Sequence, residues 1–145
     1  MTRRTFSVLS LLCAQGALVR RARAESSPSS LRGKLTTVGE QAGALTLPGG
    51  ELVFLTGDEP TRGVLRDARL NGVDFEVIGR RLRPGWFEIE PIHKRAMFVH
   101  KDGKKLFVTY WCAVCAIRTY TPGICWCCQE ETALDLRESL EISNS

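Results

Sequence analysis

Residues 96–111 read AMFVHKDGKKLFVTYW and predict a β-hairpin. The dipeptide Asp102-Gly103 lies between two segments in which apolar and polar residues alternate, and it supplies the positive φ angles that a tight hairpin turn requires. Successive side chains of a strand point to opposite faces, and the second arm carries apolar side chains on both. This arm is therefore predicted to be a central, well-covered strand.

The chain before this hairpin also consists of short apolar segments separated by turn signals, a pattern that favours strands over long helices. Two further hairpins are predicted, each from two such segments around a turn that contains proline and glycine: residues 44–47 with 51–55, and residues 75–78 with 87–89. One helix is predicted within residues 59–70, and because Gly63 weakens its propensity by about 1 kcal/mol, it can be as short as a turn or two.

The order of strands, a short helix and the Gly-ended segment LNGVDFEVIG (residues 70–79) resembles the small Greek-key barrels of the OB type. The resemblance covers residues 31–110 and implies a mainly β fold. An SH3-like barrel or a small sandwich fits the same strand pattern. We therefore expect an OB-like β domain over residues 31–111, followed by a cysteine-rich, zinc-ribbon-like segment over residues 112–137 that packs on it and a tail over residues 138–145.

Five of the six cysteines follow the hairpin within 17 residues. Two CxxC pairs, separated by nine residues, contribute four of them, and the fifth, Cys127, lies inside the second pair. A CxxC turn directs two thiolates at one ion, and two such turns provide the four sulfurs of a tetrahedral site. The predicted metal ligands are Cys112, Cys115, Cys125 and Cys128, with Cys127 as a substitute for Cys125 or Cys128.

These pairs resemble the knuckles of zinc ribbons and of rubredoxin-like iron sites. The gap between the pairs is shorter than in most ribbons, and Ala116 and Gln129 stand where a glycine often follows the second cysteine. The resemblance implies zinc, and four thiolates also suit a single iron or cuprous copper. After the second pair, residues 132–137 alternate like a closing strand, which we prefer to a helix over residues 130–140.

Residues 1–24 have the features of an export signal: two arginines, a moderately apolar run and a small-x-small cleavage site at Ala22-Arg23-Ala24. The pattern TRRTF (residues 2–6) resembles the twin-arginine signal, which implies export to the periplasm or the exterior. The apolar run of 14 residues, at about 1.5 Å per residue, is too short to span roughly 30 Å of hydrocarbon. Cys13 should leave with the signal, and residues 25–30 are expected to form a flexible leader.

The charge of the mature chain does not favour a nucleic-acid partner. Residues 1–24 hold five of the 20 basic side chains and none of the 16 acidic ones, so 15 basic and 16 acidic side chains remain. The formal charge of +4 thus becomes −1 after cleavage. The location instead suggests a partner protein of the cell envelope.

Two other uses of the cysteines remain open. Disulfides are normal in an exported protein, and they would make the chain a stapled, ligand-binding barrel. A redox dithiol is suggested by LFVTYWCAVC (residues 106–115), which resembles the strand and Trp-Cys-x-x-Cys of thioredoxin, but the 30 residues after Cys115 are too few for the rest of that fold. A metal is favoured because five thiols leave one unpaired, and because twin-arginine export of a folded protein would shield the thiolates.

Other residues give weaker indications of function than the cysteines do. His93 and His100 are expected to be hydrogen-bonded rather than metal-bound, and Arg118 to support the cysteines by packing or hydrogen bonding. None of the familiar catalytic motifs is present, so nothing in the sequence supports an enzyme. The chain as a whole resembles small bacterial exported proteins with a similar cysteine-rich C-terminal signature, and this resemblance implies no activity. The prediction is a non-enzymatic zinc protein with a structural or interaction role; the alternative is a redox or copper- or iron-handling protein.

Overall fold

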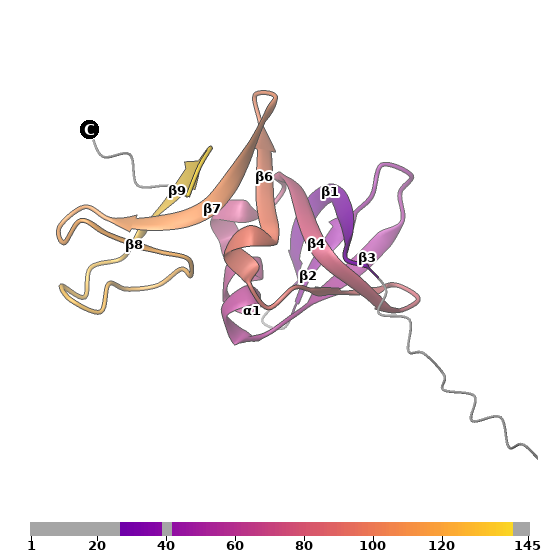
Figure 1. The fold of residues 1–145 in the computed structure, drawn as a ribbon, viewed down its shortest axis with the longest axis horizontal. Coiled ribbons are helices and arrows are strands. Elements are labelled where there is room, and N and C mark those ends of the chain that lie inside the picture. The colour runs from indigo at the N-terminus through magenta and orange to yellow at the C-terminus, as the bar shows by residue number, and fades with distance from the viewer. Residues whose placement is uncertain (1–26, 39–41, 141–145) are drawn as a thin grey trace, which may run out of the picture.

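The structure, a computed structural model, describes residues 27–38 and 42–140. The predicted signal peptide with Cys13 and the last residues of the predicted tail lie outside this part of the chain. Five strands form a barrel (Figure 1): β1 (Ser29–Val38), β2 (Ala42–Thr46), β3 (Leu52–Thr56), β4 (Asp74–Arg83) and β5 (Trp86–Ile89). The first of them begins two residues before the boundary expected at Leu31.

The barrel closes in the order β1-β2-β3-β5-β4 and back to β1. All pairings are antiparallel except that of β3 with β5, in which Phe54 lies opposite Trp86. The hairpins predicted around residues 48–50 and 83–85 are confirmed by the β2–β3 and β4–β5 pairings. This closed five-stranded Greek key confirms the OB-like, mainly β fold.

Two glycines let the strands of the barrel approach each other closely. At the point where β1 passes from β4 to β2, a Cβ on Gly33 would overlap the carbonyl oxygen of Thr46. Where β4 passes from β1 to β5, a Cβ on Gly79 would overlap the carbonyl oxygen of Glu88. Glycine is therefore required at both corners by lack of space.

The helix that joins β3 to β4 fills only the first part of residues 59–70, within the one or two turns that the sequence allowed. Helix α1 (Glu59–Leu65) is capped at its N-terminus by Asp58, whose carboxylate accepts a 3.0 Å hydrogen bond from the Thr61 amide. It ends at Leu65 because the Asp67 carboxylate caps a new turn, the 3₁₀ helix η1 (Ala68–Leu70). Apolar side chains from both helices join the barrel core. Within the described residues, no helix has the length and apolar character needed to cross a membrane.

The chain then leaves the barrel. The 3₁₀ helix η2 (His93–Arg95) precedes β6 (Met97–Lys101), which pairs with β4, and β6 forms the predicted hairpin with β7 (Lys104–Cys112). Its turn residues Asp102 and Gly103 have φ angles of 53° and 73°. The far half of β7 pairs with β8 (Ile117–Thr119) on one edge and with β9 (Ala133–Arg137) on the other, which confirms the predicted closing strand.

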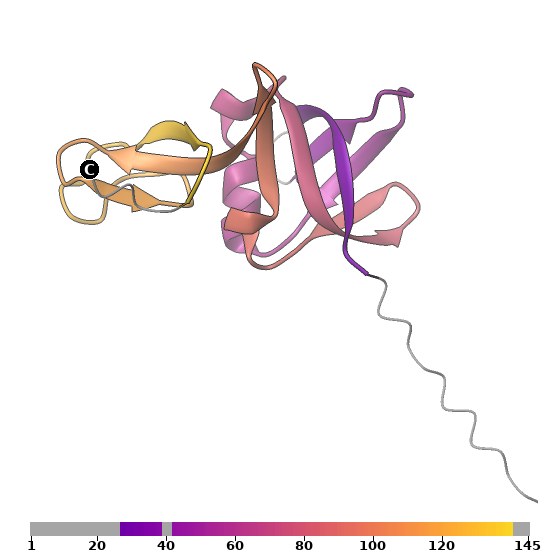
Figure 2. The same cartoon turned by 45° about the horizontal axis from the view of Figure 1, so that its top comes forward.

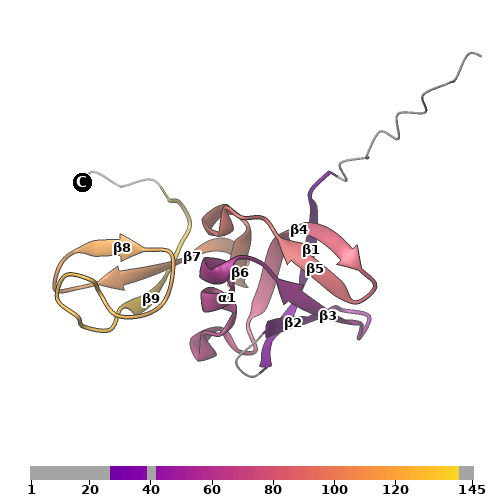
Figure 3. The same ribbon diagram turned by 90° about the horizontal axis from the view of Figure 1, so that it is seen from below.

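Residues 112–137, together with the end of β7, form a projection that we call the cysteine arm (Figures 1 and 2). Figure 3 shows α1 and β6 on the side of the barrel that faces it. Hydrogen bonds from both 3₁₀ helices reach the arm: Arg69 of η1 donates to the Thr132 carbonyl at 2.9 Å, and His93 of η2 donates to the Tyr120 carbonyl at 2.8 Å. The ammonium of Lys94 lies 5.1 Å from the centre of the Tyr120 ring.

Candidate metal centre

Four cysteine side chains meet at the far end of the cysteine arm. The Sγ atoms of Cys112, Cys115, Cys125 and Cys128 all lie within 4.8 Å of one another, and those of Cys112 and Cys128 are 3.4 Å apart. In a tetrahedral zinc tetrathiolate with Zn–S bonds of about 2.3 Å, neighbouring sulfurs are about 3.8 Å apart. The four cysteines therefore lie close enough to bind a metal ion.

The strands of the arm bring the two CxxC pairs together. Cys112 is the last residue of β7, and Cys115 lies in the turn before β8. The second pair lies in the loop between β8 and β9, and because these strands flank β7 on opposite edges, the loop must pass the end of β7. An isolated bridge between Ile124 and Glu131 closes this loop.

The two knuckles, residues 112–116 and 125–129, are held by different hydrogen bonds but share a left-handed residue after the second cysteine. In the first, the Cys115 amide donates to Cys112 Sγ at 3.4 Å. In the second, the Gln129 amide donates to the Cys125 carbonyl at 2.8 Å. The residue after each second cysteine is left-handed, with φ angles of 52° at Ala116 and 61° at Gln129. The knuckles thus adopt the backbone that glycine usually provides, although the sequence has other residues there.

Hydrogen bonds within the cluster also shift the pKa values of its cysteines. The amides of Cys128 and Cys127 donate to the Cys125 sulfur and lower the pKa of Cys125 to about 7. Hydrogen bonding with the Cys127 thiol, together with burial, raises the pKa of Cys115. The cluster therefore holds a negative charge on Cys125 more readily than on Cys115, and a bound cation would favour the thiolate at every ligand.

Cys127 stands apart from the other four. Its side chain is exposed, whereas Cys112 and Cys125 are each 1% exposed and Cys115 and Cys128 are half-buried. All five are free thiols in the structure. Of the ligand sets that the sequence allowed, the structure therefore brings together the one made of the two CxxC pairs, and it leaves Cys127 at the surface.

Arg118, which was expected to support the cluster, braces the strands beneath it. Its guanidinium donates to Thr109 Oγ1 at 2.7 Å and to the Asp135 carboxylate at 2.6 Å, and it lies 5.0 Å from the centre of the Trp111 ring. These contacts join β7, β8 and β9 directly below the first knuckle. Arg118 therefore supports the arm through its strands.

Both histidines are hydrogen-bonded, as predicted. His93 donates to the Tyr120 carbonyl, and His100 donates to the Glu76 carboxylate at 2.6 Å. Within the described residues, neither belongs to a group placed to hold a metal ion. The hydrogen bond of His93 connects η2 to the residue that follows β8.

Sequence reasoning missed the role of Arg69. This residue forms an ion pair with Asp67, donates to the carbonyl of Thr132, and places its guanidinium 5.3 Å from the centre of the Tyr110 ring. The hydrogen bond joins residues 63 positions apart, so no local motif or spacing could reveal it. Arg69 connects η1 to Thr132, the residue that precedes β9.

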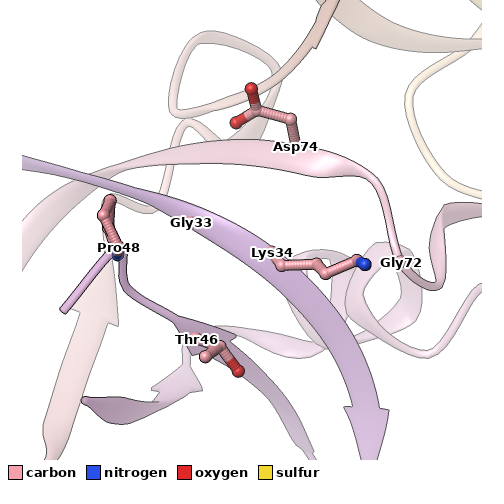
Figure 4. Close-up of a pocket in the computed structure, with 6 residues that line it drawn as sticks. All are labelled: Gly33, Lys34, Thr46, Pro48, Gly72 and Asp74. Atoms are coloured by element: carbon pink, nitrogen blue, oxygen red, sulfur yellow. The ribbon is translucent and has the colours of Figure 1, made fainter. Parts of the chain in front are cut away.

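The barrel has a surface groove of about 330 Å³, which bears on the ligand-binding alternative (Figure 4). It is lined by Gly33, Lys34, Thr46, Pro48, Gly72 and Asp74. The Asp74 carboxylate is already held by two hydrogen bonds from Arg32, at 2.9 and 2.7 Å. The groove is therefore a weaker basis for assigning a function than the cysteine cluster.

No protein-family profile, curated protein or solved structure matches this chain. The assignment of a function therefore depends on the geometry of the arm.

Proposed function

We propose that this chain is an exported, non-enzymatic zinc-binding protein in which Cys112, Cys115, Cys125 and Cys128 hold one ion. The observation that carries the proposal is the gathering of four sulfurs within 4.8 Å of one another by two knuckles, each with a left-handed residue after its second cysteine. Four thiolates with no open position are typical of a structural zinc site. Such a site also accepts a single iron or cuprous copper, so the element is the first property to measure.

The proposed role of the ion is to fold the cysteine arm. The arm has three short strands, and much of its length is loop. A metal that joins the two knuckles closes a loop between Cys112 and Cys128 and contributes its binding free energy to folding. The ion would thereby fix the loop that otherwise has few apolar side chains to bury.

An interaction role is supported by the side chains that the knuckles expose. Val114, Ile124 and Trp126 are 72%, 68% and 78% exposed, and each lies within or next to a knuckle. Exposed apolar residues of this size are common at protein interfaces. A rigid metal site would hold them in place for a partner protein of the cell envelope.

Export is supported by residues 1–24, which have the form of a twin-arginine signal. A protein exported by that route is folded beforehand, so the thiolates would receive their metal in the reducing cytoplasm. Amino-terminal sequencing of the protein from the envelope fraction tests this part of the proposal. A chain that begins at Glu25 supports it, and an intact Met1 in the cytoplasmic fraction contradicts it.

The ligand assignment is tested by two adjacent serine substitutions. We expect Cys128→Ser to weaken and shift the visible absorption of tetrahedral cobalt(II) thiolate when the reduced protein is titrated with cobalt, because one of the four sulfur ligands is lost. Cys127→Ser should leave the spectrum and the one-to-one stoichiometry unchanged. An equal change in both variants would show that Cys127 is a ligand, and a wild-type protein without the spectrum would refute the site.

A further inference from the structure

The exposed thiol of Cys127 has no role in the proposed zinc site. It belongs to the second knuckle, next to Trp126, which is 78% exposed. It directly precedes Cys128, whose Sγ lies within 4.8 Å of the Sγ of Cys115, a ligand from the first knuckle. A solvent-accessible thiol beside a metal thiolate is the arrangement in which an oxidant meets the surface sulfur first.

We propose that Cys127 is an oxidant-reactive modification site that releases the metal by forming a disulfide with Cys115. The inference rests on the proposed function, because it concerns the regulation of the same four-cysteine site. The reagent class is a peroxide, which the oxidising exterior of a cell supplies.

The structure favours Cys115 over the other three cysteines as the partner. Cys112 and Cys125 are each 1% exposed, so a modified Cys127 at the surface reaches neither without opening the cluster. Cys128 is the adjacent residue, and Cα atoms joined by a trans peptide lie about 3.8 Å apart, below the roughly 4.4–6.8 Å of ordinary disulfides. Cys115 is half-buried and comes from the facing knuckle.

The reaction proceeds in two steps. The Cys127 thiol attacks one oxygen of hydrogen peroxide, the O–O bond breaks, and the products are the Cys127 sulfenic acid and water. The Cys115 sulfur then attacks the sulfenic sulfur, an S–S bond forms, and the departing hydroxide takes a proton from solvent to become a second water. Two sulfurs together lose two electrons, and the peroxide gains them.

The disulfide removes one of the four ligands. Cys115 can no longer serve as a thiolate, so the ion keeps only Cys112, Cys125 and Cys128. A three-sulfur site leaves one position to water and binds the ion less tightly than the closed site. The two knuckles remain joined by the S–S bond, and a thiol reductant restores both sulfurs by exchange.

The test uses metal-loaded full chain, hydrogen peroxide as the probe and a zinc-binding dye as the readout. Metal content is measured before peroxide is added, and the disulfides are mapped afterwards by mass spectrometry of peptides. The test variant is Cys127→Ser. Its matched control is Val114→Ser, which changes the equivalent exposed position of the first knuckle, the residue before the second cysteine.

We expect peroxide to release zinc from the wild type with a Cys115–Cys127 bridge, and dithiothreitol to permit reloading. Release should slow by about tenfold in Cys127→Ser and stay within about twofold of wild type in Val114→Ser. Equal release from Cys127→Ser and wild type, or a bridge between Cys112 and Cys128, overturns the inference while the zinc site stands. A wild-type chain that carries no metal before peroxide overturns the proposed function itself.

Discussion

At the scale of single residues, Ala116 and Gln129 hold a left-handed conformation that costs a side chain free energy. The cost is about 1–2 kcal/mol for a residue with a Cβ. Glycine avoids it but makes the unfolded chain more flexible, which offsets about 0.5–1 kcal/mol of the gain. These two terms predict the sign of a substitution in the first knuckle.

Ala116→Gly should therefore raise the free energy of unfolding of the metal-loaded protein by about 0.5–1 kcal/mol. Its matched control is Ala113→Gly in the same knuckle, where φ is not positive; there only the flexibility term acts, and stability should fall by a similar amount. Denaturant unfolding measures both. A loss of stability in both variants would mean that the φ of 52° at Ala116 imposes no strain.

A second single-residue effect concerns Glu76 on β4. Burial would raise the pKa of its carboxyl, but hydrogen bonds from His100, Ser30 and Lys105 outweigh burial and lower the pKa from 4.5 to about 2. The folded protein thus holds this proton less tightly than the unfolded chain does. The ionised carboxylate stabilises the fold above about pH 4.5, and this contribution is lost as the pH falls towards 2.

We expect the free energy of unfolding to drop by about 2–3 kcal/mol between pH 6 and pH 2 through this one group. Glu76→Gln should be less stable at pH 6 and should have a correspondingly flatter acid limb. Urea unfolding across this pH range measures the slope. If the variant keeps the wild-type slope, the hydrogen bonds around Glu76 do not lower its pKa.

The residue scale also shows what the sequence could reveal of the site. The spacing of Cys112, Cys115, Cys125 and Cys128 was enough to select the four sulfurs that the structure gathers. Residue type was a poor guide to backbone conformation. The absence of glycine after each CxxC pair suggested a departure from the usual knuckle backbone, but the positive φ angles at those positions show that the backbone is the usual one. The exposure of Cys127 depends on the path of the loop and could not be read from its position in the sequence.

At the scale of the elements, closure of the barrel depends on two close strand crossings. Gly79 lies where a Cβ would overlap the backbone of β5, which cannot move without breaking the pairing of β4 with β5. Gly79→Ala should lower the free energy of unfolding by about 2–4 kcal/mol. In Gly49→Ala, the added Cβ meets nothing within 4 Å, and stability should stay within about 1 kcal/mol of wild type.

Thermal unfolding of the two alanine variants provides the measurement. A small effect of Gly79→Ala would show that β4 and β5 separate at this corner without cost. In that case the close crossing would not be what closes the barrel, and the parallel pairing of β3 with β5 would have to account for closure.

Local elements were predictable because their signals are local. The turn at Asp102-Gly103 fixes its own hairpin, and the alternation over residues 132–137 correctly indicated a strand. Within residues 59–70 the helix has only the short form that the sequence allowed, because the Asp67 carboxylate starts a new turn after Leu65 although the apolar spacing continues. The β3–β5 pairing and the contact of Arg69 with Thr132 join distant residues, and no periodicity encodes them.

At the scale of the whole molecule, the barrel closes through β1 to β5 and does not need the arm for its strand pairing. The arm, in contrast, has its two knuckles joined by the cysteine cluster. Because the metal is proposed to stabilise the arm, removing the metal should destabilise the arm more than the barrel.

Treatment of the reduced protein with a strong zinc chelator should therefore remove hydrogen-exchange protection from β8, β9 and both knuckles. Amides in β1 to β5 should keep theirs. Amide hydrogen exchange read by mass spectrometry resolves the two regions. Loss of protection in the barrel together with the arm would show that the two fold as one unit and that the ion stabilises both.

The presence and identity of the metal are the central claim, and native mass spectrometry of protein isolated from the producing cell, without added metal, tests them most directly. The account predicts a mass that includes one zinc ion, and after denaturation all the thiols from Cys112 to Cys128 should be open to alkylation. A metal-free mass lowered by about 4 Da, as two disulfides would give, with only one thiol open to alkylation, would contradict it. The cysteines would then staple the arm, and the zinc site would have to be abandoned.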